Sequence, residues 1–201
     1  MKRAWHFLSL ALVGILAVPL SAQRAKRDPG TYAIFQTSMG TIVCKLLTTV
    51  TPAAADNFIG LAEGTKDWTD PANGEKKTKT PFYNGTIFHS VYPKFMIQGG
   101  DPLANGKGGP GYKLADEIVP SLKFDAPGRL AMANSRPNAG GSQFFITAAA
   151  APHLNGHHTI FGQVVEGQDV VGKIAAVPRD KQQRPRTPVR ITKVTIQRIK
   201  K

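Results

Sequence analysis

The stretch Gly141-Ser142-Gln143-Phe144-Phe145-Ile146-Thr147 decides the fold of this chain. Its last four residues are aromatic or β-branched, which favours a β-strand. Successive side chains of a strand point to opposite faces, so the two adjacent phenylalanines must enter different layers of the protein. Alternation alone does not say which of the two packs in the main core.

Other short apolar runs lie on both sides of this stretch, with glycine-rich connections between them. Many short strands and only two candidate helices predict a mainly β fold, either a closed barrel or a sandwich. We find no internal repeat and no second domain. The predicted strands cover residues 32–36, 41–47, 86–91, 95–100, 129–134, 159–165 and 189–199.

Two segments have helical signals. Thr51 stands at an N-cap position, Pro52 at the first helical position and Gly64 just past the expected end of the helix. A second short helix is expected at 168–176. The polar segment 65–81 is rich in Lys, Thr, Asp and Gly and predicts an exposed loop.

The N-terminus has the pattern of a secretory signal peptide. Lys2 and Arg3 precede an apolar run at 4–18, and small residues follow it. We therefore predict a signal peptide at 1–22, a linker at 23–30 and a single domain at 31–201 with a basic C-terminal end. The protein is expected to be exported to the periplasm or outside the cell, with no stable membrane insertion after cleavage. An uncleaved anchor is the alternative.

Charge and cysteine content limit the remaining classes. The chain has 26 Lys and Arg against 13 Asp and Glu, a net charge of +13, and much of the excess lies at 179–201. A solvated basic edge and a polyanion-binding surface both fit this charge. No nucleic-acid-binding motif accompanies it, so no specific nucleic acid partner is expected. Cys44 is the only cysteine, which excludes an internal disulfide, and its alternation with Ile42 and Leu46 predicts a core position.

Other site chemistries find little support. Gly106-Lys107 resembles the end of a phosphate-binding loop, but Asp101 stands where the required glycine should be. A metal site at the three clustered histidines would need a regular ligand geometry, and Pro152 and the following turn residues argue against it. No serine nucleophile lies in a strand-turn-helix elbow, which disfavours a hydrolase.

Three stretches are more specific: FHSVYPKFMIQGGD (88–101), MANSRPNAGGSQFFIT (132–147) and HLNGHHTIFG (153–162). Together they resemble the cyclophilin family of peptidyl-prolyl cis-trans isomerases, in the family's order and over about residues 32–193. The resemblance implies a closed eight-stranded antiparallel β-barrel with two capping α-helices and a substrate groove on its outer side. It also implies a monomer that needs no cofactor or metal and acts on proline-containing polypeptides.

The resemblance assigns roles by motif position. It implies that Phe144 lies in the core and Phe145 in the groove. The implied catalytic residues are Phe95, Gln98, Phe145 and His158, and the implied substrate-binding residues are Met96, Ala133, Asn134, Gln143, Leu154 and His153.

One position departs from the family pattern. The residue after the Phe-His pair is an arginine in the family and is Ser90 here. A serine hydroxyl is short and uncharged, so it cannot replace a guanidinium as a donor. Arg136 and Lys94 are the substitutes that the sequence offers. Two hypotheses follow: an isomerase that assists the folding of exported proteins, or a proline-binding chaperone or scaffold with weak catalysis.

Overall fold

The structure is a computed structural model that describes residues 27–200. The predicted signal peptide at 1–22 and the first half of the predicted linker, residues 23–26, lie outside the described residues. The elements, in chain order, are β1 Gly30–Thr37, β2 Gly40–Leu46, α1 Pro52–Glu63, β3 Trp68–Thr69, β4 Lys76–Lys77, β5 Ser90–Tyr92, β6 Met96–Gly99, β7 Arg129–Met132, β8 Phe144–Thr147, the 3-10 turn η1 Pro152–Leu154, β9 Ile160–Glu166, α2 Gln168–Ala175 and β10 Ile191–Ile199.

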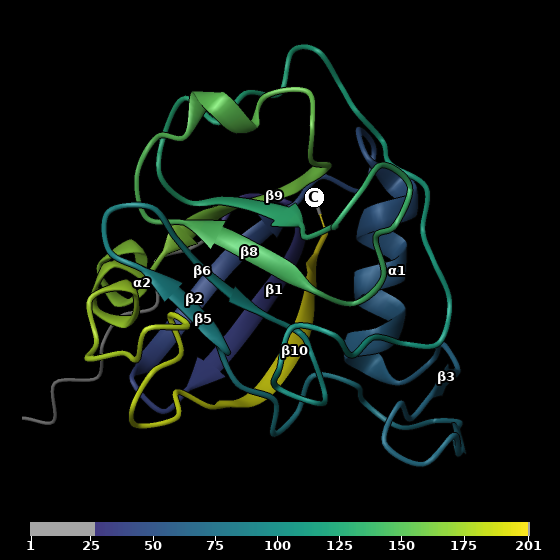
Figure 1. Ribbon diagram of the computed structural model, residues 1–201. Coiled ribbons are helices and arrows are strands. Elements are labelled where there is room, and N and C mark those ends of the chain that lie inside the picture. The colour runs from purple at the N-terminus through teal and green to yellow at the C-terminus, as the bar shows by residue number, and fades with distance from the viewer. Residues whose placement is uncertain (1–26, 201) are drawn as a thin grey trace, which may run out of the picture.

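Eight strands form one antiparallel sheet in the order β10-β1-β2-β9-β7-β8-β6-β5. The sheet curls, and α1 and α2 lie at opposite sides of it (Figure 1). Just before the two end strands, the Phe88 N–H donates to the Val189 carbonyl (3.0 Å) and the Ile191 N–H to the Thr86 carbonyl (2.8 Å). Within residues 27–200, β5 and β10 form no ladder with each other. The mainly β prediction with two helices is confirmed; the sheet is a curled half-barrel, and its full closure is not confirmed.

The start of α1 differs from the sequence prediction. Pro52 begins the helix as expected, but the Thr51 hydroxyl does not cap it. This buried hydroxyl instead donates to the Ile160 carbonyl at 3.1 Å. The carboxylate of Glu117 accepts hydrogen bonds from the first N–H groups of the helix, those of Ala53 (3.1 Å) and Ala54 (2.7 Å). A carboxylate there also favours the positive end of the helix dipole, so a residue distant in sequence caps the helix.

The segment 65–81 is more ordered than the predicted exposed loop. Its strands β3 and β4 pair antiparallel. Trp68 is 9% exposed and packs its ring 4.7 Å from that of Phe82. The Trp68 indole N–H donates to the Thr80 carbonyl at 3.0 Å. One buried tryptophan in an otherwise polar segment thus anchors a small hairpin to the core.

Strand β8 separates two apolar clusters. Phe144 is 0% exposed and lies in the main core, with ring contacts to Phe35, Phe58, Tyr83 and Phe88. Phe145 is 4% exposed and belongs to a second, smaller cluster with Phe124, Ala131, Ala151 and Ile160. The facing implied for the two phenylalanines is therefore confirmed.

Cys44 lies in β2 and is buried in the main core, as its alternation predicted. Burial raises the pKa of its thiol well above the ordinary value, because the thiolate would be desolvated. A protonated buried thiol is a poor nucleophile, so a reactive cysteine finds no support.

Phe144→Ala should lower the free energy of unfolding by about 3–5 kcal/mol, the cost of removing a large aromatic side chain from a packed core. Urea unfolding followed by tryptophan fluorescence measures this change. Phe145→Ala is the matched control and should cost less, because its ring borders an open cavity. A larger loss for Phe145→Ala than for Phe144→Ala would contradict the facing of β8.

Candidate active site

A cavity with an apolar wall lies on the outer side of the sheet and has a volume of about 660 Å³. Its apolar wall comes from β6, β8 and the 3-10 turn η1. Phe95, Met96, Phe145 and Leu154 form this wall, and Ala133 adjoins them. Residues from separate parts of the chain therefore make one apolar surface, large enough for a small apolar ring.

Two aromatic rings, those of Phe124 and His158, pack against the ring of Phe145. The ring of Phe124 stacks on that of Phe145, with 5.7 Å between centroids and 20° between planes. The His158 ring meets Phe145 edge-on, at 5.2 Å and 85°. Phe124 was missed by sequence reasoning because it lies in an irregular segment without helix or strand periodicity. Its place beneath the cavity emerges only from the tertiary structure.

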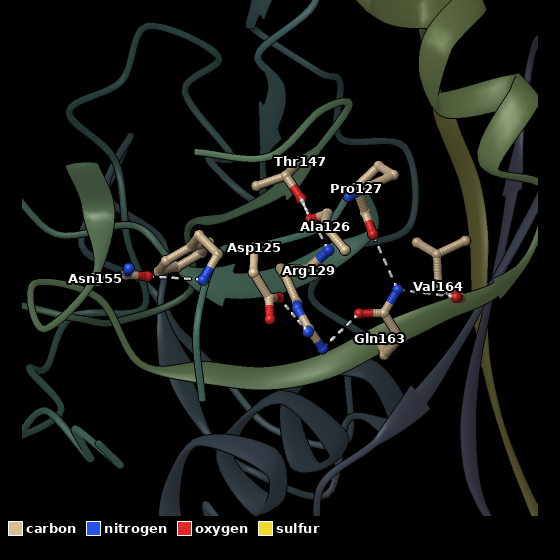
Figure 2. Close-up of polar contacts among 9 residues, drawn as sticks. Asp125, Ala126, Pro127, Arg129, Thr147, Asn155, Gln163 and Val164 are labelled. Carbon is tan, nitrogen blue, oxygen red and sulfur yellow. Dashed lines mark hydrogen bonds and ion pairs between the residues drawn. The ribbon is translucent and has the colours of Figure 1, made fainter. Parts of the chain in front are cut away.

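A polar network holds the segment that carries Phe124. Figure 2 shows Arg129 reaching between Asp125 and Gln163, with bonds of 2.6 Å and 3.0 Å. The Phe124 N–H donates to Oδ1 of Asn155 at 2.8 Å, close to η1. These bonds tie the irregular segment to β9 and to the turn that carries Leu154. Hydrogen bonds on the side of this segment that faces away from the cavity therefore fix the position of Phe124.

Opposite the apolar wall, the rim is polar. Nε2 of Gln98 donates to Oε1 of Gln143 at 3.0 Å. Nε2 of Gln143 in turn donates to the carbonyls of Gly106 (3.0 Å) and Gly108 (2.8 Å). This chain of bonds connects β6, β8 and the glycine-rich loop that follows β6. On the far side of the cavity, Nδ2 of Asn134 donates to the carboxylate of Asp116 at 3.1 Å.

The surroundings of His158 favour its neutral form. Burial lowers its pKa because the imidazolium would lose hydration, although a hydrogen bond to the backbone of Met132 acts in the other direction. Its Nδ1 is buried and has no hydrogen-bond partner within the described chain. With Nδ1 buried, the imidazole contributes its ring to the cavity lining, edge-on to Phe145.

Nine of the residues assigned from the sequence line this one cavity, and their roles in binding or catalysis stay predictions. They are Phe95, Met96, Gln98, Ala133, Asn134, Gln143, Phe145, Leu154 and His158.

Three other assigned residues do not line this cavity in the described part of the chain. His153 packs against the outer side of Phe95, 5.3 Å between ring centroids. Arg136 lines a neighbouring groove of about 650 Å³ together with His157. Ser90 is half-buried on β5, directly opposite Gln98 on β6, so the two side chains share one face of the sheet.

Fold, cavity and motifs together define a cyclophilin-type peptidyl-prolyl cis-trans isomerase. The family model described as cyclophilin type peptidyl-prolyl cis-trans isomerase/CLD matches residues 32–196, and the chain belongs to this family. Peptidyl-prolyl cis-trans isomerase A of Mycobacterium tuberculosis is 49% identical over 166 residues, which cover 82% of this chain and 91% of that protein. Peptidyl-prolyl cis-trans isomerase B of Streptomyces anulatus is 48% identical over 170 residues, 84% of this chain and 94% of that protein.

A solved structure resembles the whole fold. The cyclophilin type peptidyl-prolyl cis-trans isomerase of Cryptosporidium parvum, crystallised in the presence of the dipeptide Ala-Pro, superposes with a TM-score of 0.71 at 35% sequence identity. The match covers 84% of this chain and 99% of that one. These relatives and the family model indicate prolyl isomerase activity for this chain, acting on proline-containing peptides.

Stability should depend on pH through two histidines, the buried His89 and the half-buried His158. Burial lowers the pKa of His89 and of His158 below the ordinary value of about 6.5. The unfolded chain therefore binds protons that the folded chain does not as pH falls below about 6.5, so the free energy of unfolding should decrease between pH 7 and pH 5. Each full proton of difference is worth about 1.4 kcal/mol per pH unit.

His89→Leu should make this pH dependence shallower, because both ring nitrogens of His89 are buried without partners in the described chain. The exposed His153→Gln is the matched control and should keep the wild-type slope, because His153 is not among the groups that shift the pKa of His89 or His158. Urea unfolding at several pH values gives the slopes. An unchanged slope in His89→Leu would show that its imidazole does not take part.

Proposed function

We propose that this chain isomerises X-Pro bonds in exported polypeptides and so assists their folding, working as a monomer. The observation that carries the proposal is the single cavity in which an apolar wall faces a polar rim. The wall suits a proline ring, and the rim offers groups for the peptide backbone on either side of it. The solved relative was crystallised in the presence of the dipeptide Ala-Pro, which supports a proline-containing ligand for this chain.

The chemistry needs no covalent step. Rotation about the X-Pro bond is slow because it breaks amide resonance, with a barrier of about 18–20 kcal/mol in amides. A site accelerates rotation if it binds the twisted amide more tightly than either planar form. Phe95, Phe145 and Leu154 hold the ring, which leaves the preceding carbonyl free to turn at the polar rim. A donor directed at the prolyl nitrogen then stabilises the lone pair that twisting releases.

Export is the part of the proposal that rests on the sequence. The basic start and short apolar run at 1–22 fit a cleaved signal peptide. Within the described part of the chain, no helix is long and apolar enough to cross a membrane. Mass spectrometry of the protein recovered from the culture medium or periplasm should show loss of residues 1–22. Recovery of only the full-length chain, in the membrane fraction, would contradict cleavage.

A second candidate function is favoured by Ser90, which offers only a hydroxyl at the β5 side of the cavity. A chain without a strong donor there would bind prolyl segments and release them with little catalysis. Such a proline-binding chaperone would show ordinary peptide affinity and a rate near that of the spontaneous reaction. The turnover rate of the wild-type chain separates the two candidates.

Phe145→Ala should reduce kcat/KM at least tenfold in a protease-coupled assay on an Ala-Pro peptide, because the ring forms the apolar wall of the cavity. Val165→Ala, an exposed residue of β9 remote from the cavity lining, is the control and should match the wild type. A wild-type chain with no rate above the spontaneous reaction, but with normal peptide affinity, would favour the chaperone. Wild-type activity in Phe145→Ala would mean that the cavity is not the catalytic site.

A further inference from the structure

The donors that line the cavity are mostly engaged by the protein itself. Both hydrogens of the Gln143 amide are used by the loop carbonyls, and the Asn134 amide donates to Asp116 and to the His157 carbonyl. The Ser142 hydroxyl donates to Gly100, and the Tyr112 hydroxyl to Asn57. Gln98 keeps one free hydrogen but is neutral. A strong donor for a twisted amide must come from elsewhere.

Two lysines also line the cavity, Lys107 and Lys113. Neither has a side-chain hydrogen bond or ion pair within residues 27–200; only the backbone N–H of Lys107 is bonded, to Asn105 at 2.9 Å. Charged donors form hydrogen bonds roughly twice as strong as neutral ones. These two lysines are therefore the cations available to a bound substrate.

Lys107 lies on the side of the cavity next to β5 and β6. The carbonyls of its two neighbours, Gly106 and Gly108, accept from Gln143, which is bonded to Gln98 opposite Ser90. A Cβ placed on Gly106 would lie 3.9 Å from Nε2 of His89, so the loop abuts the residue before Ser90. Lys113 instead precedes Leu114, whose N–H donates to Gly140 at 2.7 Å, on a different loop.

The loop that carries Lys107 is held in place on both sides. The buried carboxylate of Asp101 accepts the N–H groups of Leu103 (2.8 Å), Asn105 (3.0 Å) and Gly106 (2.5 Å). Together with the two Gln143 bonds, these contacts fix the backbone on either side of Lys107. A fixed backbone reduces the conformational freedom that the lysine loses when its ammonium engages a substrate.

We propose that the ammonium of Lys107 supplies the cationic donor for the twisted X-Pro amide, from the loop after β6, where Ser90 offers only a short hydroxyl. This rests on the proposed isomerase function. The four-carbon stem of lysine lets the ammonium reach over the rim from an exposed loop position. No bond is formed or broken, and no proton is transferred: the ammonium is positioned beside the prolyl nitrogen while the amide is out of plane.

The test is a set of variants in the protease-coupled assay, with peptide affinity measured separately. Lys107→Met keeps the stem and removes the charge, and it should lower kcat about tenfold to a hundredfold with a smaller change in peptide affinity. Lys107→Arg should retain most of the activity. Arg184→Met is the matched control: this exposed arginine acts electrostatically on His89 but does not line the cavity, and its loss should leave kcat unchanged.

Ser90→Arg completes the experiment as a double-mutant cycle. In the Lys107→Met background it should restore activity, whereas in the wild type it should add much less. Full activity in Lys107→Met, with an unchanged melting temperature, contradicts the role of Lys107 while leaving the isomerase function intact. Equal gains from Ser90→Arg in both backgrounds contradict it as well. A wild-type chain without turnover overturns the proposed function and this inference together.

Discussion

Strand β8 cannot direct two adjacent side chains to one face, and the rest of the structure depends on this constraint. Phe144 enters the aromatic core beneath α1, while Phe145 enters the outer cluster that becomes the cavity wall. Phe144 thus contributes to the stability of the fold, and the next residue, Phe145, contributes to the site. A one-residue shift in register would move the polar rim residue Gln143 away from the cavity as well, because it shares a face with Phe145.

Gln143 links the side-chain facing of β8 to the polar rim of the cavity. Its amide accepts from Gln98 and donates to two carbonyls of the loop after β6, so the rim is set by the same strand that sets the wall. The wall needs only shape and burial to hold a proline ring. The rate enhancement needs a donor whose bond strengthens as the amide twists. In our proposal this donor comes from the loop after β6, because Ser90 stands where the family pattern has an arginine.

Much of the fold could be predicted from the sequence, because strand alternation and the helix boundary residues Pro52 and Gly64 are local signals. Features that depend on distant contacts could not: Glu117 caps α1 from another segment, and Trp68 anchors a hairpin inside a polar stretch. In the site, too, local signals could be predicted and distant contacts could not. Nine of the assigned motif residues line one cavity, whereas the support from Phe124 and the placement of Lys107 arise from loops whose paths no periodicity reveals.

The central claim is that the cavity beside Phe145 both binds and turns over prolyl peptides. Exchange NMR on an Ala-Pro peptide with a catalytic amount of the mature chain tests it without a coupling protease. The account predicts exchange peaks between the cis and trans forms well above the spontaneous rate, with chemical-shift changes centred on Gln98, Gln143 and Phe145. Shift changes confined to the Arg136 groove, or binding at the cavity with no added exchange, would contradict it.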